Sequence, residues 1–224
     1  MWPFKRRPLL DDDTAQWHID NACWFLRHFG RTPMVTNARL ILPGRGYFRL
    51  HSDLTGIGLA REILKQMKGF IGRPDWVLDI SAEGEADETT IFLPGDAGDD
   101  PFRLICWLSY DLAWRVMASL SDDPPCDESN WKCLAEAAAC FMGFGVFLAD
   151  VSVISNTRPI GLNHVSEPEA YAAELSTWLP ESDIVFDLAI FLTFKELSAD
   201  AALSFLKPFV ADKLKTAMID IQPY

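Results

Sequence analysis

The chain has 224 residues, and 49% of them are hydrophobic, so it can bury a large core as one compact unit. Its formal net charge of −12 opposes binding to phosphate backbones and anionic membranes, so we expect neither a nucleic acid nor a membrane as partner. The 5 cysteines form no C-x-x-C pair, and their odd number argues against a secreted disulfide framework. We therefore expect reduced thiols and a cytoplasmic protein.

The N-terminal part predicts one long helix. Residues 1–8 are basic, but Asp11, Asp12 and Asp13 follow them instead of an apolar stretch, so the start does not resemble a signal peptide. A helix capped by Asp13 or Thr14 is expected to run to about residue 28 and to end at Gly30.

The next part mixes short extended segments with a helix. Residues 38–42 and 47–50 are candidates for extended structure around a turn rich in glycine. Apolar residues recur at helical spacing over residues 58–70. Residues 76–81 and 89–93 have strand-like patterns and are joined by an acidic turn, which predicts a small mixed or antiparallel sheet.

A second long helix has a clear start, because Asp99 and Asp100 precede Pro101, and both acid and proline favour helix initiation. Leucines four residues apart form a core stripe along it. Tyr110 and Trp114 form a second stripe with Asp111 at its edge. Taken alone, these aromatic residues are typical of the core or of the boundary between core and surface, because each has an apolar body and one polar atom.

A loop with two prolines, residues 121–128, separates this helix from an apolar one over residues 134–149. Gly143 and Gly145 interrupt the apolar helix, and the absence of side chains predicts the close approach of a neighbouring backbone or ring. Glu136 stands in the same apolar run. A buried carboxylate needs a partner, here Tyr110, Trp114 or Arg115, or else stays protonated with a raised pKa.

After Asp150 small and polar residues predict a connection over residues 151–161. Three further helical segments follow, at residues 167–178, 184–196 and 200–219. We therefore expect a core of residues 1–150 and a helical C-terminal extension of residues 151–224 packed on that core.

Four segments in order, residues 17–30, 38–72, 91–116 and 134–149, resemble an uncharacterised family of bacterial zincin-like proteins. In the H-E-x-x-H motif of zincins, two histidines on one helix face bind zinc and the glutamate between them activates a water molecule. Here Tyr110, Asp111 and Trp114 occupy those three places, and Glu136 falls where the resemblance puts an acidic third ligand. Phenol and indole are not usual zinc ligands, so we expect neither a metal nor another cofactor.

The resemblance implies a predominantly helical α+β fold, in which a zincin-like helix pair packs with a small sheet and a helical C-terminal part. It also implies a metallopeptidase-like scaffold without zinc-peptidase activity. The 4 histidines have no ligand spacing and are interpreted as structural or surface residues: His18, His28, His51 and His164.

Three functional hypotheses follow. The first is a catalytically inactive pseudoenzyme that binds an unknown protein or peptide in the old cleft. The second is an acidic interaction or immunity-type protein that works through its surface, where Asp122, Asp123, Asp127 and Glu128 form either an acidic rim beside the cleft or a solvated loop. The third is a metal-independent hydrolase that uses Asp111 and Glu136 for acid–base chemistry, with Tyr110 as a proton donor.

Overall fold

The computed structural model describes residues 7–30, 32–44, 46–83, 87–93, 100–120, 122–156 and 178–222. It is mainly helical with a small two-stranded sheet, which confirms the predominantly helical α+β class. The α-helices are α1 (Asp12–Phe29), α2 (Pro33–Thr36), α3 (Gly56–Phe70), α4 (Pro101–Ala118), α5 (Trp131–Ala139), α6 (Gly145–Asn156), α8 (Glu181–Phe194), α9 (Asp200–Leu203) and α10 (Pro208–Asp220). A 3-10 turn η2 (Glu128–Asn130), a π-helical segment η3 (Cys140–Phe144) and strands β1 (Asp79–Ser81) and β2 (Thr90–Phe92) complete the described elements.

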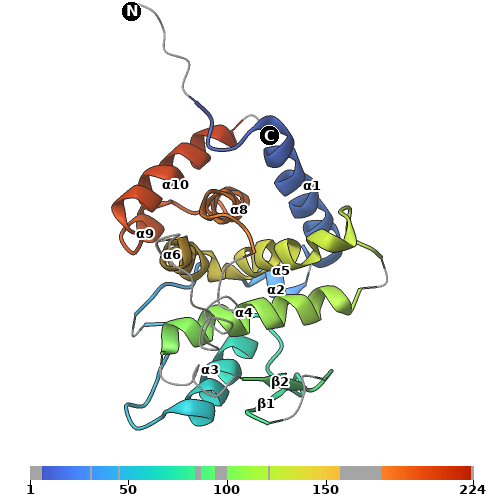
Figure 1. Cartoon of the computed structure of the whole chain (residues 1–224), viewed down its shortest axis with the longest axis vertical. Helices are drawn as coiled ribbons and strands as arrows, with labels where there is room; N and C mark the ends of the chain where they lie inside the picture. The colour runs from blue at the N-terminus through green and yellow to red at the C-terminus, as the bar shows by residue number, and fades with distance from the viewer. Residues whose placement is uncertain are drawn as a thin grey trace, which may run out of the picture.

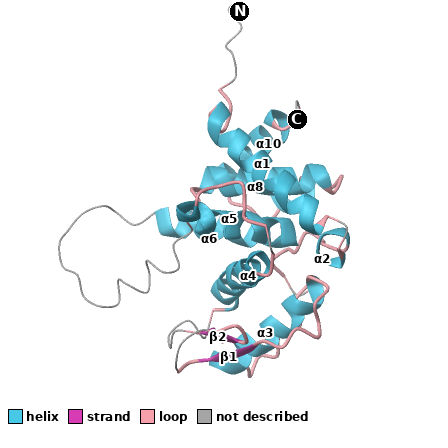
Figure 2. Ribbon diagram, turned by 90° about the vertical axis from the view of Figure 1, so that its right-hand side faces the viewer, coloured by secondary structure: helices cyan, strands magenta, loops and turns pink. Residues whose placement is uncertain are grey.

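The helices are stacked in layers around a central row formed by α5, η3 and α6 (Figure 1). Helices α1, α8 and α10 lie on one side of that row, while α4 lies on the other side, followed by α3 and the sheet (Figure 2). Helix α8 contacts α1, α5, α6 and α10. The C-terminal helices therefore share one hydrophobic core with the N-terminal part of the chain.

The central row bends at Gly143, where φ is +99° and the backbone leaves helical geometry. The Gly143 carbonyl accepts a hydrogen bond from the Ile41 amide at 2.9 Å, so residues 38–42 run against the bend. A Cβ atom at position 143 would lie 2.1 Å from the Arg39 carbonyl oxygen. Gly145 lies against Leu188 of α8, with a Cβ position 3.1 Å from that side chain. Both glycines therefore permit close packing, as the sequence predicts.

Acidic caps set the starts of the two long helices. The Asp100 carboxylate accepts a hydrogen bond from the Phe102 amide at 2.9 Å, and Pro101 is the first residue of α4, as expected. The predicted cap of α1 is wrong by two or three residues, because Asp11 is the N-cap and accepts hydrogen bonds from the Thr14 amide and hydroxyl. Capping by Asp11 leaves Asp13 and Thr14 within the first turn of α1.

The sheet differs from the prediction, since β1 and β2 pair in parallel, with Ile80 opposite Ile91. Just before β2, the Asp87 carboxylate accepts hydrogen bonds from the amides of Thr89 and Thr90. Because the two strands are parallel, they do not form a hairpin, and β2 starts at the same end of the sheet as β1. Residues 38–42 and 47–50, expected to be extended, form no strand.

The C-terminal prediction also needs correction. Helix α6 continues to Asn156, so residues 151–156 are helical where the sequence predicts a connection. The helix expected at residues 167–178 falls almost wholly outside the described residues. The segment at 184–196 corresponds to α8, and the segment at 200–219 is divided between α9 and α10 by Pro208.

By length and composition alone, the stretch Glu128–Asp150 could cross a membrane, because an 18-residue window within it has a mean hydropathy of 1.6. In the folded protein, 89% of this window is buried. The stretch occupies the middle of the helical stack, so its apolar side chains contribute to the core (Figure 1).

We expect Gly143→Ala to lower the free energy of unfolding by at least about 2 kcal/mol, because alanine is strained at positive φ and its methyl group would overlap the Arg39 carbonyl. Gly69→Ala in α3 is the matched control, since no atom lies within 4 Å of its Cβ position. That change should be neutral or stabilising by up to ~1 kcal/mol. Urea unfolding measures both, and equal effects would contradict the account of the bend.

Candidate functional site

Two of the four predicted site residues, Tyr110 on α4 and Glu136 on α5, lie next to residues 178–180, which lead into α8. The Glu136 carboxylate accepts a hydrogen bond from the Leu179 amide at 2.7 Å. The Cys133 thiol lies 3.8 Å from the Trp178 carbonyl, and the Lys132 ammonium lies 4.1 Å from the centroid of the Trp178 ring. Residues 178–179 are thus fixed across the start of α5, on the side of the Glu136 carboxylate.

Burial raises the pKa of both side chains, Glu136 and Tyr110. Desolvation raises the pKa of Glu136 to about 7, although hydrogen bonds from the backbone of Leu179 and Trp178 work in the other direction. Desolvation, with the nearby charges of Glu136 and Asp111, raises the pKa of Tyr110 to about 12. The sequence offered a raised Glu136 pKa as one alternative, and the direction of the shift agrees with it. The partner of Glu136 differs from the predicted side chains, because its carboxylate accepts a hydrogen bond from the Leu179 amide, while Arg115 binds Asp111.

Asp111 is engaged in a structural ion pair. Its carboxylate accepts a hydrogen bond from Arg115 Nε one helical turn further along α4. The guanidinium also donates to the carbonyls of Asp87, Glu88 and Thr90 at 2.7 to 2.9 Å. Arg115 therefore ties α4 to the connection between the strands, and Asp111 neutralises the charge. Asp111 and Glu136 thus have different partners. Asp111 binds Arg115, which contacts the residues leading into β2, whereas Glu136 binds the Leu179 amide before α8.

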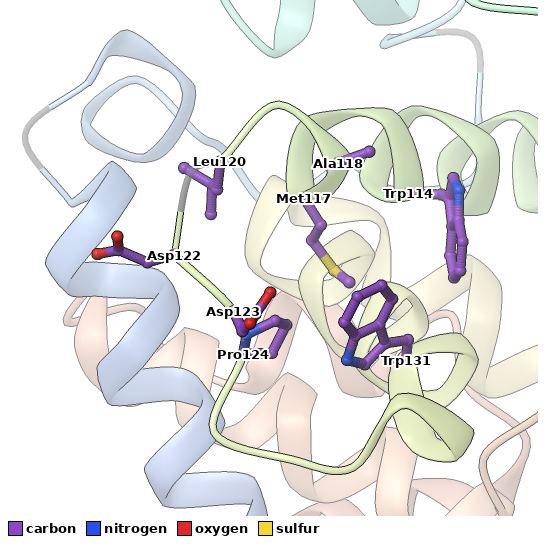
Figure 3. Close-up of a pocket in the computed structure, with 8 residues that line it drawn as sticks. All are labelled: Trp114, Met117, Ala118, Leu120, Asp122, Asp123, Pro124 and Trp131. Atoms are coloured by element: carbon purple, nitrogen blue, oxygen red, sulfur yellow. The ribbon is translucent and has the colours of Figure 1, made fainter.

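Trp114 takes up a different environment from Tyr110, although the rings stack with centroids 6.5 Å apart. It is 36% exposed and lines a surface cavity of about 230 Å³ at the end of α4 (Figure 3). The walls come from the end of α4, the following loop and the first residue of α5, and they include Trp114, Met117, Ala118, Leu120, Asp122, Asp123, Pro124 and Trp131. The position that the resemblance assigns to a second zinc-binding histidine thus borders an apolar cavity with an acidic edge.

The acidic residues at the cavity have different surroundings. The Asp122 carboxylate lies 3.8 Å from Nε2 of His28 on α1 and points away from the cavity (Figure 3). The Asp123 carboxylate points toward Met117 and Trp131 in the same view. Asp123 belongs to the acidic stretch that the sequence analysis considers as a rim beside the cleft or as a solvated loop, whereas Trp131 was not predicted as a site residue. A tryptophan in the first turn after a proline-rich acidic loop is the signal that could have indicated Trp131.

Metal binding finds no support among the described residues, where no three or more His, Cys, Asp or Glu side chains form a group able to hold a metal ion. The 5 cysteines are free thiols. Burial raises the pKa of the Cys106 and Cys140 thiols, which is consistent with their packing in the core as small apolar residues.

A buried charge cluster joins α1 to α8, and it was not predicted. His18 Nδ1 lies 2.8 Å from the Asp187 carboxylate, and Nε2 lies 3.2 Å from the Asp183 carboxylate. Burial opposes protonation of His18, but the two carboxylates outweigh it and raise its pKa to about 9. Protonation of His18 therefore contributes stability that is fully present below the ordinary histidine pKa of 6.5 and is lost as the pH rises through about 9, as long as the two carboxylates are ionised. The sequence analysis interprets His18 as a structural or a surface residue, and its burial shows that it is a structural residue of the core.

The chain matches no protein-family model, no curated protein and no solved structure. The zincin-like relationship thus rests on the resemblance of the sequence segments, and the site is interpreted from its own geometry.

We expect Glu136→Gln to remove the part of the pH dependence of the unfolding free energy that comes from titration of Glu136. Glu136 has a raised pKa in the folded protein, so its contribution is present below about 4.5 and lost as the pH rises through about 7. Glutamine can still accept the Leu179 hydrogen bond. The stability of the variant relative to the natural protein should therefore rise by roughly 2 to 3 kcal/mol between pH 5 and pH 8.

Urea unfolding at the two pH values measures this difference, in which the contributions of other groups cancel. Glu128→Gln removes the same charge from an exposed side chain and controls for net charge. A constant difference between Glu136→Gln and the natural protein would contradict the assignment.

Proposed function

We propose that this chain is a catalytically inactive, metallopeptidase-like scaffold that acts by binding a protein or peptide partner at the cavity beside Trp114. The observation that carries the proposal is the environment of Trp114. A tryptophan at the place of a motif histidine could have filled the core, but it remains 36% exposed and forms the wall of a cavity with Trp131. Aromatic side chains at concave surfaces are typical anchors of protein interfaces.

The surroundings of the other site residues support binding over catalysis. An acid–base pair must reach the same reacting group. Asp111 is held by Arg115 toward the sheet, whereas Glu136 is 4% exposed and is bound to the Leu179 amide. The hydrolase hypothesis would need these two carboxylates to be released from their partners and to turn toward each other.

The acidic surface remains the second candidate function, favoured by one observation. The loop that borders the cavity has four exposed acidic residues: Asp122, Asp123, Asp127 and Glu128. A partner held by this surface alone would bind through long-range charge, with an affinity that falls as the salt concentration is raised.

The first test of the proposal is elemental analysis of the purified, tag-free protein. We expect much less than one zinc per chain, because tyrosine and tryptophan stand at the histidine positions. Added zinc should leave the thermal unfolding midpoint unchanged. A content near one zinc per chain would overturn the proposal of a metal-free scaffold.

The second test selects binders from a library of random peptides displayed on phage. We expect enriched peptides whose binding is lost in Ala118→Trp, because this exposed alanine lines the cavity and a bulky ring there would fill it. Ala201→Trp is the matched control, since Ala201 is exposed on α9, away from the cavity (Figure 1). Titration of synthetic peptides by calorimetry should give at least about a tenfold loss of affinity for Ala118→Trp only.

Peptides that bind both variants equally well would place the binding surface elsewhere. The absence of enriched peptides that depend on the cavity would contradict the proposed function.

A further inference from the structure

We infer that the cavity between Trp114 and Trp131 receives a single lysine or arginine side chain from a basic segment of a partner protein. The inference rests on the proposed function and names the chemistry of its ligand. It follows from the size of the cavity, the side chains that line it and the charges around it.

The size favours one side chain over a whole small molecule. The cavity has a volume of about 230 Å³, and pockets that hold drug-sized ligands have volumes of roughly 300 to 1,000 Å³. A lysine or arginine side chain is long and narrow, with an apolar stem and a charged end. Such a side chain can bury its stem among Met117, Leu120 and Pro124 while its charged end lies at the polar edge.

The lining favours a cation. Trp131 stands between Asp123 and Trp114 in Figure 3, so the indole rings and a carboxylate border one space. The face of an indole ring attracts ammonium and guanidinium groups, with Trp the strongest of the aromatic side chains in this respect. A carboxylate forms its strongest hydrogen bonds with these same groups. A neutral apolar side chain would instead desolvate Asp123 without giving it a partner.

The surrounding charges favour a basic partner as well. The exposed residues Asp127 and Glu128 add negative charge to the loop, and the whole chain has a net charge of −12. Among the basic side chains of α4 and α5, Arg103 is paired with Asp100 and Arg115 with Asp111, while Lys132 lies over the neutral ring of Trp178. The field at the cavity therefore attracts a basic segment and repels an acidic one.

The test uses the peptides enriched in the selection described above. We expect them to contain lysine or arginine, and replacement of the critical lysine by norleucine, or of the critical arginine by citrulline, should weaken binding about tenfold. Asp123→Asn should weaken binding of the original peptide to a similar extent. Asp127→Asn removes the same charge from the same loop, outside the cavity wall, and should change the affinity less than about threefold.

A double-mutant cycle decides whether Asp123 and the cation interact. On Asp123→Asn, the uncharged peptide should bind nearly as well as the original, so the two changes are not additive. Additive effects, or equal losses for Asp123→Asn and Asp127→Asn, would overturn the inference. Enriched peptides that depend on the cavity but contain no basic residue would also overturn it, and would leave the proposed function intact.

Discussion

The fold depends on the bend at Gly143, where the central row of helices comes into backbone contact with residues 38–42. Residues 134–149 of the central row are all buried, and the other layers pack on both sides of this row (Figure 2). The bend gives α5 a direction in which Glu136 meets the segment entering α8, while Gly145 lets α8 pack closely on the start of α6. One residue without a side chain thus permits the bend between α5 and α6.

Buried polar groups then select one packing of these apolar helices. Leucine, alanine and phenylalanine surfaces can slide past one another at little loss of burial, but a buried carboxylate needs its particular donor. Glu136 finds the Leu179 amide, Asp187 finds His18 across 169 residues of chain, and Asp111 finds Arg115. The first two pairings join different segments of the chain, whereas Asp111 and Arg115 lie on the same helix and Arg115 in turn binds the connection between the strands. These polar contacts therefore favour one relative placement of the segments that they join.

The sequence predicts local features well and long-range partners poorly. Asp100 and Pro101 locate the start of α4, and Gly143 and Gly145 indicate a close approach, because the reasons lie within a few residues. The parallel pairing of β1 and β2 is accompanied by hydrogen bonds from Arg115, which is distant in sequence, to carbonyls of the residues leading into β2, and no local pattern indicates that contact. Asp187 stands in a run whose apolar character predicts only burial. Its partner His18 has no distinguishing pattern, and only the fold brings them together.

The four positions that the resemblance assigns to a metal site lie in three different environments. Tyr110 and Glu136 lie on the side covered by residues 178–179, and Asp111 is the counterion of Arg115. Trp114 alone borders open space, together with Trp131 and Asp123. An exposed indole beside a cavity leaves apolar surface in water, and contact with a partner would bury that surface. The open cavity with its aromatic walls and acidic edge is therefore the argument for our proposal that this part of the surface binds a partner.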